Sequence, residues 1–249
     1  MIIKRIISPA TPSVISKLYS LLVAINAPAV NKFLIYADPA YPAYLANIID
    51  NSSDDQFYIA ESDNQLAGFA HFKKVKPDTI HLNNIIIADG YRSNNAGKKL
   101  LTYAINKLRT DMPGLKNFTL DVFGSNAGVF DWYKRLGMLV TDQSNWYNIT
   151  GIFEQGIDKP RETEACTILK DENGFQGIYV NGLKLASLIN NNALVFRDDV
   201  NLFENLHSLK ELVEKENFNS AILITKHKYD FPLMDVSYRL SVDLSNLTV

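Results

Sequence analysis

The sequence predicts an α+β protein, and three observations support that fold class. Three strand-like runs follow one another between residues 57 and 88 with only short polar turns between them, which is the pattern of antiparallel hairpins. Residues 95–109 and 202–216 carry apolar side chains at helical spacing. Strand candidates surround both helices, so each half of the chain has the material for a hydrophobic core.

Residues 1–150 are expected to form one domain with the element order β, α, α, three strands, α, β, α, β. Pro12 suits a helix start, and Gly137 suits the end of a short helix. The expected strands are 2–7, 57–61, 66–75, 79–88, 117–123 and 138–149. The first expected helix begins at Pro12. Three further helices are expected at 43–49, 95–109 and 128–136.

Residues 151–249 are expected to form a smaller α+β accessory domain of unknown role, joined through a linker at 151–161. This segment shows no convincing internal repeat, nucleophile–base pair or phosphate loop, so we expect it to do no chemistry itself. His207 and His227 are interpreted as surface residues. The strand candidates are 166–170, 175–180, 193–197, 221–225 and 236–242, around a helix at 202–216.

Composition excludes several function classes. The 249 residues are 47% hydrophobic and 21% charged, and the formal net charge of −2 provides no electrostatic basis for binding nucleic acid or an anionic membrane. No apolar stretch resembles a signal peptide or a bilayer span. The single cysteine, Cys166, excludes an intrachain disulfide and is expected in the core. We expect a cytoplasmic protein with no metal, nucleic-acid partner or membrane.

The first chemical signal is the turn between a strand and a helix at residues 91–99. Small and amide side chains at a helix start leave backbone N–H groups free, and these groups together with the helix dipole favour a pyrophosphate. Taken alone, such a turn is more typical of an ordinary helix start. The candidate phosphate-binding residues are Arg92, Ser93, Asn94, Asn95, Ala96, Gly97 and Lys98.

The second signal is the segment 126–138, which predicts a short helix. Asn126 and Tyr133 are seven positions apart, so they lie on the same side of that helix. Taken alone, Tyr133 also fits an aromatic residue of the core. The two segments occur in order within the predicted strand pattern, which makes the pair more specific than either segment by itself.

Together, the two segments resemble the acyl-CoA motifs of the GNAT acetyltransferases. Residues 92–97 are similar to the family's Arg/Gln-x-x-Gly-x-Gly/Ala turn, with Asn95 in place of the central glycine. Asparagine tolerates left-handed backbone angles, so we expect the turn to keep its shape. The resemblance covers residues 1 to about 150 and implies a mixed, mostly antiparallel sheet flanked by helices.

The resemblance also implies a reaction, the direct transfer of an acetyl group from the cosubstrate acetyl-CoA to a primary amine of a small molecule or peptide. In the family the CoA arm lies between two splayed strands, which correspond here to 81–88 and 117–123. The arm would pair with backbone groups of Ile85 and Ile87. A backbone N–H near Ile85 or Ile86 would polarise the thioester carbonyl.

His81 is the candidate general base, since no carboxylate stands on the strand before the phosphate turn, where the family often has a glutamate. Strand alternation predicts that His81 shares a face with Asn83, Ile85 and Ile87. Imidazole has a suitable pKa range for this role. A half-exposed strand residue without a catalytic role is the alternative.

The resemblance assigns two further roles and one location. Asn126 would hydrogen-bond the CoA arm, and Tyr133 would protonate the departing thiolate. The amine acceptor would lie against the first two helices and their loop, where Tyr36, Tyr41 and Tyr44 occur. A packing role fits these three tyrosines equally well.

Two other functions stay open at this stage. Asn95 and the missing strand carboxylate also fit an acyl-CoA sensor without turnover. The strand, helix, strand order of 193–242 also allows a degenerate second GNAT-like unit, and thus a tandem aminoacyl- or long-acyl transferase, although no second phosphate turn occurs there. Residues 151–249 are expected to shape an acceptor cleft or to form a homodimer contact, and their acidity favours a cationic acceptor.

Overall fold

A computed structural model describes residues 1–24, 29–154, 165–197 and 199–248, and at residues 93 and 94 it describes the backbone alone. The chain forms two compact units, each built from separate stretches. The sequence places one boundary at residue 150, whereas the units interleave along the chain. Unit 1 comprises Met1–Asn26, Pro42–Asp142 and Tyr238–Val249, and unit 2 comprises Ala27–Tyr41 and Gln143–Ser237.

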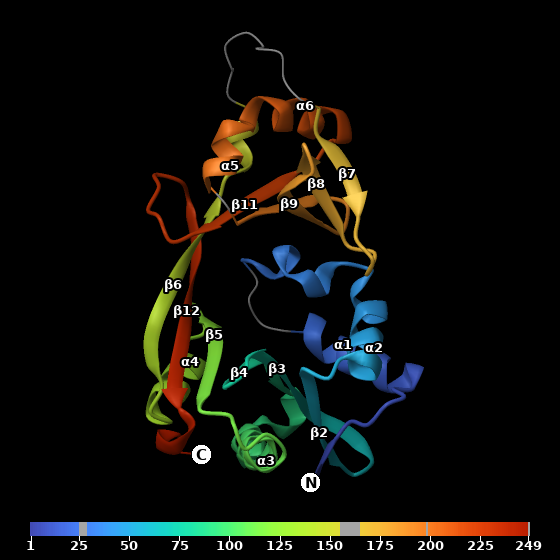
Figure 1. Cartoon of the computed structure of the whole chain (residues 1–249), viewed down its shortest axis with the longest axis vertical. Helices are drawn as coiled ribbons and strands as arrows, with labels where there is room; N and C mark the ends of the chain where they lie inside the picture. Colours follow the sequence, from blue (N-terminus) through green and yellow to red (C-terminus); the bar gives the residue numbers. More distant parts are fainter. Residues whose placement is uncertain (25–28, 155–164, 198, 249) are drawn as a thin grey trace. The chain divides into compact units, whose positions relative to one another are not determined.

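The sheet of unit 1 has the strand order β1-β2-β3-β4-β5-β12-β6 (Figure 1). Strands β1 to β4 are antiparallel neighbours, and β4 pairs with β5 in parallel. The last strand of the chain thus completes the sheet of the first unit. The strands are β1 Ile2–Arg5, β2 Asp55–Ser62, β3 Gln65–Lys76, β4 Thr79–Ile87, β5 Asn117–Phe123, β6 Leu139–Asn148 and β12 Leu233–Asp243.

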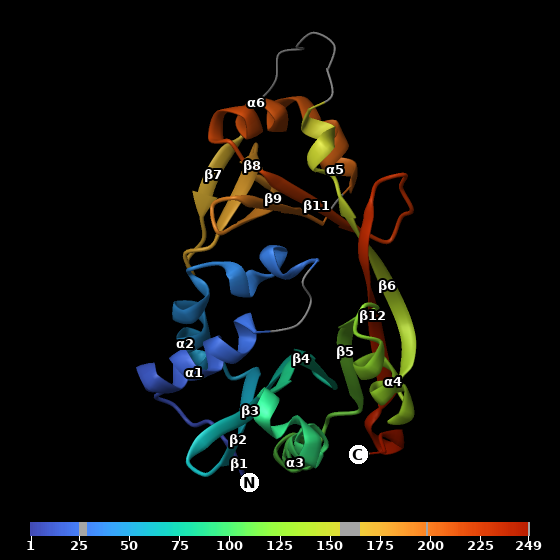
Figure 2. The same ribbon diagram turned by 180° about the vertical axis from the view of Figure 1, so that it is seen from behind.

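Helices lie on both faces of this sheet. Figure 2 shows α3 on one face and α1 and α2 on the other. Thr11 begins α1, where its side chain accepts a hydrogen bond from the Val14 N–H. The apolar side of α3 is buried in the main core with residues of β2 to β5. The helices are α1 Pro12–Val23, α2 Tyr41–Asn51, η3 Asp89–Asn94, α3 Ala96–Asp111, α4 Ala127–Arg135 and η5 Leu244–Asn246.

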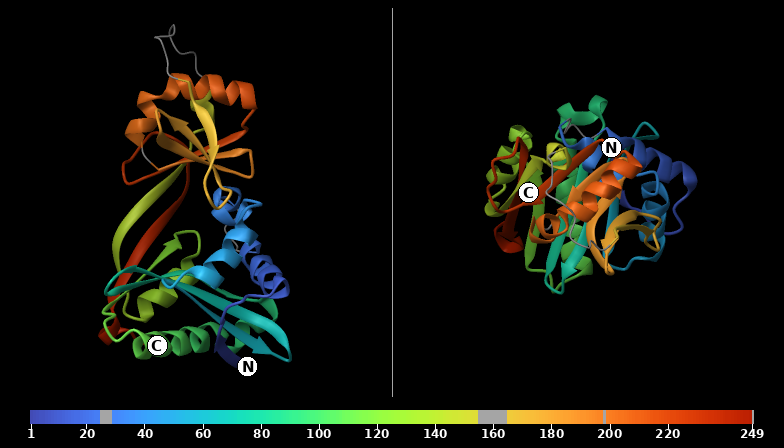
Figure 3. Two further views of the ribbon diagram at one scale, coloured as in Figure 1. Left: turned by 45° about the vertical axis from the view of Figure 1, so that its right-hand side comes forward. Right: turned by 90° about the horizontal axis from the view of Figure 1, so that it is seen from above.

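Unit 2 has its own core and the strand order β6-β11-β10-β9-β8-β7. Helices α5 and α6 cover one face of this sheet (Figure 3). The strands are β7 Thr167–Lys170, β8 Gln176–Val180, β9 Leu183–Ile189, β10 Ala193–Phe196 and β11 Ser220–Thr225. The helices are η1 Asn31–Phe33, η2 Ile35–Ala37, η4 Thr150–Phe153, α5 Asp199–Glu204 and α6 Leu206–Glu216.

The two units repeat one topology. In each, four consecutive antiparallel strands lead through helical structure to a fifth strand that is parallel to the fourth: β1 to β4, α3 and β5 in unit 1, and β7 to β10, α5, α6 and β11 in unit 2. The next neighbour is β12 beside β5 and β6 beside β11. The sequence shows no convincing repeat and only allows a degenerate second unit in the strand, helix, strand order of 193–242, because the repeat lies in strand order and not in residue identity.

The structure confirms the predicted fold class and most elements, and it corrects two details. The expected continuous helix at 202–216 is wrong, since Asn205 separates α5 from α6. Strand β9 at Leu183–Ile189 was missed because its residues do not alternate cleanly. Of the expected linker at 151–161, residues 151–153 belong to η4, and residues 155–161 lie outside the described residues.

Candidate active site

The parallel strands β4 and β5 separate partway along their length. Their register pairs Thr79–Leu82 with Asn117–Leu120 and ends there. Both strands nevertheless continue, β4 to Ile87 and β5 to Phe123. The facing edges beyond the last pair have backbone groups that can bind an extended ligand.

A β-bulge interrupts β4 where the two strands part. Leu82 lies opposite Phe72 of β3, whereas the next β3 residue, His71, lies opposite Asn84. Asn83 is therefore the inserted residue of the bulge. An inserted residue shifts the alternation of all the side chains that follow it by one position.

This shift corrects the face expected for the strand. Residues directly opposite one another in a sheet share a face, and Ile85 and Ile87 pack in the α3-side core that contains Leu82. His81 points to the other face, which it shares with Ile86. The expectation that His81 shares a face with Ile85 and Ile87 is wrong because sequence alternation cannot register a bulge.

The backbone of Ile85–Ile87 lies along the open edge. A Cβ at Gly68 of β3 would lie 2.5 Å from the Ile86 carbonyl oxygen, so Ile86 turns its backbone groups toward β3. Successive strand residues turn their backbone groups to opposite edges. Ile85 and Ile87 therefore face the gap, and of the two residues proposed for the oxyanion contact, Ile85 has its N–H directed into the gap.

The turn after β4 leads into a helix start without a side-chain cap. Asn95 has φ 54° and ψ 25°, the left-handed conformation that the sequence predicted for it. Its side chain makes no capping hydrogen bond, and the described first turn of α3 contains no acidic residue. The N–H groups there are available to an anion. A Cβ at Gly97 would lie 3.6 Å from Ile87 Cγ1, an ordinary contact distance, so a larger side chain would extend beside Ile87 at the helix start.

Basic side chains surround this turn. Arg92 Nε donates to the Ile87 carbonyl oxygen at 3.0 Å, and its Nη1 lies 2.8 Å from Asp89 Oδ1. The guanidinium thus joins the turn to the end of β4. Lys98 and Lys99 are exposed on the first turn of α3. The Ser93 and Asn94 backbones belong to η3, and their side chains lie outside the described residues.

Helix α4 positions the second predicted pair. Asn126 precedes the helix with an exposed side chain that does not cap it. Tyr133 is 3% exposed and packs in the core of unit 1, with its ring centroid 4.7 Å from that of Trp132. Burial raises the pKa of Tyr133 above its ordinary value, so the hydroxyl is protonated at neutral pH.

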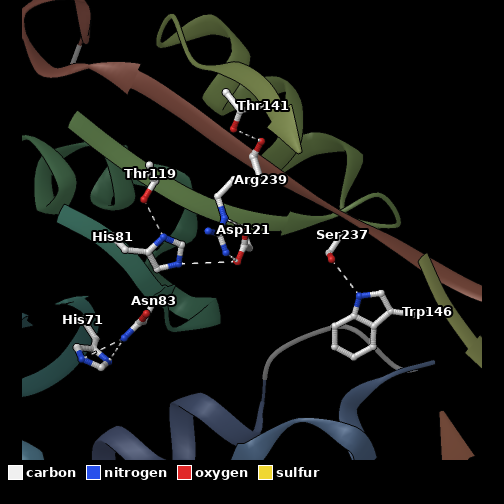
Figure 4. Close-up of polar contacts among 9 residues, drawn as sticks. All are labelled: His71, His81, Asn83, Thr119, Asp121, Thr141, Trp146, Ser237 and Arg239. Atoms are coloured by element: carbon white, nitrogen blue, oxygen red, sulfur yellow. Dashed lines mark hydrogen bonds and ion pairs between the residues drawn. The ribbon is translucent and has the colours of Figure 1, made fainter. Parts of the chain in front are cut away.

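His81 lies in a polar group that joins β4, β5 and β12 (Figure 4). Its Nδ1 is 2.9 Å from Thr119 Oγ1, and its Nε2 is 3.9 Å from Asp121 Oδ2. Burial lowers the pKa of His81, and the positive charge of Arg239 acts in the same direction, whereas Asp121 opposes the shift. The ring is therefore neutral at pH 7 and able to accept a proton.

Two members of this group were missed in the sequence. Arg239 donates to both carboxylate oxygens of Asp121, at 2.5 and 2.7 Å. Thr119 and Asp121 alternate on β5, which is a signal that the sequence contains, but Arg239 is on the last strand of the chain. Only the insertion of β12 beside β5 brings Arg239 to the site.

A second polar group on the same face was also missed. His71 Nε2 lies 2.5 Å from Asp55 Oδ1, and both residues are buried. Asn83 Nδ2 lies 3.3 Å from His71 Nδ1. Burial lowers the pKa of His71. For Asp55 burial has the opposite effect, but hydrogen bonds from His71 and Ser52 outweigh it and hold the pKa below the usual range.

The remaining candidates lie elsewhere. Tyr36 and Tyr41 belong to unit 2, where their rings meet edge to face at 5.1 Å, whereas Tyr44 belongs to α2 of unit 1. Cys166 packs against the core of unit 2, and burial raises the pKa of its thiol to about 11. In the described ranges, no three His, Cys, Asp or Glu side chains gather to hold a metal.

No helix in the described part of the chain has the length and apolar character needed to cross a membrane.

Residues 22–138 match the family model for the acetyltransferase (GNAT) family. No curated protein sequence matches the chain.

Solved structures provide a further comparison. The chain is similar to a tandem GNAT protein from the clavulanic acid biosynthesis pathway, solved without acetyl-CoA, with 9% identity, a TM-score of 0.65 and 98% of both chains covered. A Thermoplasma acidophilum protein named as an acetyltransferase, with no substrate given, has 12% identity, a TM-score of 0.56 and coverage of 98% of this chain and 100% of its own. PaiA N-acetyltransferase of the same organism, solved with coenzyme A, has 21% identity, a TM-score of 0.44 and coverage of 57% and 92%. At these identities the first two matches establish a shared fold over nearly the whole chain.

Proposed function

The chain carries a domain of the acetyltransferase (GNAT) family at residues 22–138, and we propose that it is an N-acetyltransferase that moves an acetyl group from acetyl-CoA directly to a primary amine. Family membership supports an acyltransferase. The amine belongs to a small molecule or a peptide, and both substrates are held in one complex so that no acyl-enzyme forms.

One observation supports this proposal most strongly. The gap between β4 and β5 opens after Leu82 and leads along β4 to the uncapped start of α3. An extended pantetheine arm fits the free edges as an added strand, and a pyrophosphate fits the exposed N–H groups of the helix start. The residues that would hold CoA are Ile85, Ile86, Ile87, Arg92, Ser93, Asn94, Asn95, Ala96, Gly97, Lys98 and Asn126.

The proposed nucleophilic step uses His81 as the base. With Nδ1–H donated to Thr119, Nε2 accepts a proton from the amine, and the Asp121 carboxylate at 3.9 Å stabilises the imidazolium that forms. The amine nitrogen forms a C–N bond to the thioester carbonyl carbon. The N–H of Ile85 stabilises the negative charge on the carbonyl oxygen.

The second step breaks the C–S bond. The Tyr133 hydroxyl gives its proton to the departing thiolate, so that the products are the acetylated amine and free CoA. Burial raises the pKa of Tyr133, so the hydroxyl is in the protonated form that this step needs. The proton that His81 received returns to solvent, and the second proton that the nitrogen loses as the amide forms replaces the one that Tyr133 gave to the thiolate.

Two alternatives have their own supporting observations. An acyl-CoA sensor would also use the β4–β5 gap, and Asn95 at the phosphate turn is the feature that favours it. A tandem aminoacyl- or long-acyl transferase is favoured by the repeated topology of the two units, a fold shared with a tandem GNAT protein. Turnover separates the sensor from both enzymes, and acyl-donor preference separates the two enzymes.

Unit 2 is proposed to assist without doing chemistry, by shaping acceptor binding or by forming a homodimer contact. Ending the chain at Gly151 is no clean test of this role, since unit 1 includes Tyr238–Val249 and strand β12. The full chain with substitutions in unit 2 is the proper material.

The proposed function is tested with the full-length protein in two measurements. CoA at millimolar concentration should raise the melting temperature, because a ligand that binds only the folded state stabilises it. Acetyl-CoA consumption should then be followed against a panel of primary amines. No thermal shift overturns CoA binding, and a shift without turnover on any amine favours the sensor.

A further inference from the structure

Asp55, His71 and Asn83 form a hydrogen-bonded row on the face of unit 1 that carries His81. Asp55 Oδ1 lies 2.5 Å from His71 Nε2, and the other carboxylate oxygen accepts from Ser52 Oγ at 2.6 Å. Asn83 Nδ2 lies 3.3 Å from both ring nitrogens of His71. Asp55 and His71 are buried, whereas Asn83 is exposed. Figure 4 shows the contact between Asn83 and His71.

The partners of His71 determine where its ring proton lies. A carboxylate oxygen 2.5 Å from Nε2 requires a hydrogen between the two atoms, so Nε2 donates to Asp55. Burial lowers the pKa of His71 despite its bond to Asp55, so the ring carries this one proton and Nδ1 has a free lone pair. Phe57 stacks on the ring, with centroids 4.1 Å apart and planes 12° from parallel, and holds it in place.

The lone pair on Nδ1 orients the amide of Asn83. A lone pair attracts the NH₂ group and repels the carbonyl oxygen, so Nδ2 turns toward His71. The oxygen Oδ1 consequently turns away from the ring. Because the side chain is exposed, that oxygen is an outward-facing acceptor.

Asn83 stands at the opening of the β4–β5 gap. It is the bulge residue that follows Leu82, the last β4 residue paired with β5. It also lies two residues after His81, with its side chain on the same face. Asn83 Oδ1, His81 Nε2 and the Asp121 carboxylate are all hydrogen-bond acceptors on side chains of β4 and β5. A primary alkylammonium has three N–H donors and matches this set.

We propose that Asn83 Oδ1 binds an N–H of the acceptor amine, and that His71 and Asp55 are positioning residues that hold the amide in this orientation. The proposal rests on the N-acetyltransferase function and specifies its acceptor as a primary alkylammonium. Asn83 accordingly contributes to amine binding and leaves the CoA site unaffected.

The first test compares three variants by steady-state kinetics on the best amine of the panel. Asn83→Ala removes the outward oxygen and should raise the amine KM roughly 10- to 100-fold, the usual range for a hydrogen bond to a charged group. Asn83→Asp keeps an outward acceptor but sets a second oxygen against the lone pair of His71 Nδ1, so it should restore only part of that loss. Asn106→Ala, an exposed asparagine on α3, is the matched control and should behave as wild type.

The second test concerns the positioning residues. The double variant His71→Phe/Asp55→Asn keeps a ring against Phe57 and avoids a buried unpaired charge. It should raise the amine KM less than Asn83→Ala does, with the acetyl-CoA KM unchanged. Adding Asn83→Ala to this background should cost less than it costs alone, because both changes act through one contact.

The outcomes distinguish this proposal from the function beneath it. An amine KM for Asn83→Ala equal to that of Asn106→Ala, in an enzyme that acetylates amines, overturns the role of Asn83. An Asp variant as poor as the Ala variant shows that the outward group is a donor and overturns the amide orientation. Fully additive effects in the second test overturn the positioning role. A wild type that binds CoA without turnover overturns the proposed function, and this proposal with it.

Discussion

The parallel strand pairs of the two units have the same topology, but they differ in how far the strands stay paired and in the charge at the start of the adjoining helix. In unit 1, β4 and β5 part after four paired residues and leave a gap, whereas in unit 2 all four residues of β10 pair with β11. In unit 1 the helix between the two strands begins after left-handed Asn95 and has no acidic residue in its described first turn. In unit 2 the corresponding helix starts with Asp199.

The Asp199 carboxylate is already engaged. Its Oδ2 accepts from Thr225 Oγ1 at 2.8 Å, from His227 Nδ1 at 2.6 Å and from Tyr229 OH at 3.1 Å. A negative side chain at this helix start repels phosphate. Under the proposed function, the repeated fold offers a place for CoA in each unit, and the local residues decide whether CoA can enter it.

The largest effect is expected from a substitution that blocks the start of helix α3 in unit 1. Gly97→Phe should abolish the thermal shift with CoA, because the new side chain meets Ile87 and covers the helix start. At a CoA concentration of 100 Kd the wild type should gain about 2.7 kcal/mol. Gly114→Phe is the control, since a Cβ there has no described atom within 4 Å.

The same comparison predicts one CoA per chain, measured by titration calorimetry. A second site of similar affinity would show that Asp199 does not close unit 2. A normal CoA shift in Gly97→Phe would place the phosphates elsewhere.

The next effect concerns the base. His81→Gln should lower turnover about 10²- to 10⁴-fold, the usual contribution of general base catalysis. His207→Gln, on α6 of unit 2, is the matched control and should keep full activity. In the wild type the base works only when neutral, and burial lowers its pKa from 6.5. Titration of His81 should therefore leave turnover unchanged near pH 7. Turnover should fall below pH 6.5, where the imidazole becomes protonated.

The pH profile of the variant completes this test. The acid limb should disappear in His81→Gln, since the titrating group is gone. If the limb persists unchanged, another group limits the rate and His81 is a strand residue without a catalytic role.

A smaller effect is expected at the leaving group. Tyr133→Phe should keep the CoA thermal shift and lower turnover on the order of 10²-fold, because only proton donation is lost. Tyr103→Phe, at a partly exposed tyrosine of α3, is the control. Full turnover in Tyr133→Phe would mean that Tyr133 is a packing residue and that water protonates the thiolate.

The smallest effect tests the unit 2 side. Asp199→Asn should lower the free energy of unfolding by about 1–3 kcal/mol, as a buried acceptor of three hydrogen bonds is weakened. Burial raises the pKa of Asp199, but the bonds from Thr225, His227 and Tyr229 outweigh it and hold the pKa below 3.8. A carboxyl whose pKa is lower in the folded state than in the unfolded state stabilises the fold at any pH above its unfolded pKa.

The stability difference between wild type and Asp199→Asn should accordingly be present at pH 7 and shrink as the pH falls below 3.8. Denaturant titrations at pH 7 and at a pH below 3.8 measure this stability difference. A variant as stable as wild type at pH 7 would show that the Asp199 network does not hold β10 and β11 closed.

Local features of the sequence predict the fold class and the two segments that resemble the family's acyl-CoA motifs. Both are local features: hydrophobic periodicity specifies a strand or a helix, and the left-handed conformation of Asn95 follows from the tolerance of its own side chain. The seven-residue spacing of Asn126 and Tyr133 likewise needs no tertiary information. These predictions depend on neighbours in the chain, and neighbours in the chain are visible in the sequence.

Only the tertiary structure decided which residues surround His81. The bulge at Asn83 reversed the face of Ile85 and Ile87, since one extra residue against β3 shifts every later side chain. Strand pairing brought His71 to Asp55, and the insertion of β12 brought Arg239 to Asp121, across 118 positions of sequence. Such contacts depend on register and strand order, which are set by packing between distant segments and leave no periodic trace in the sequence.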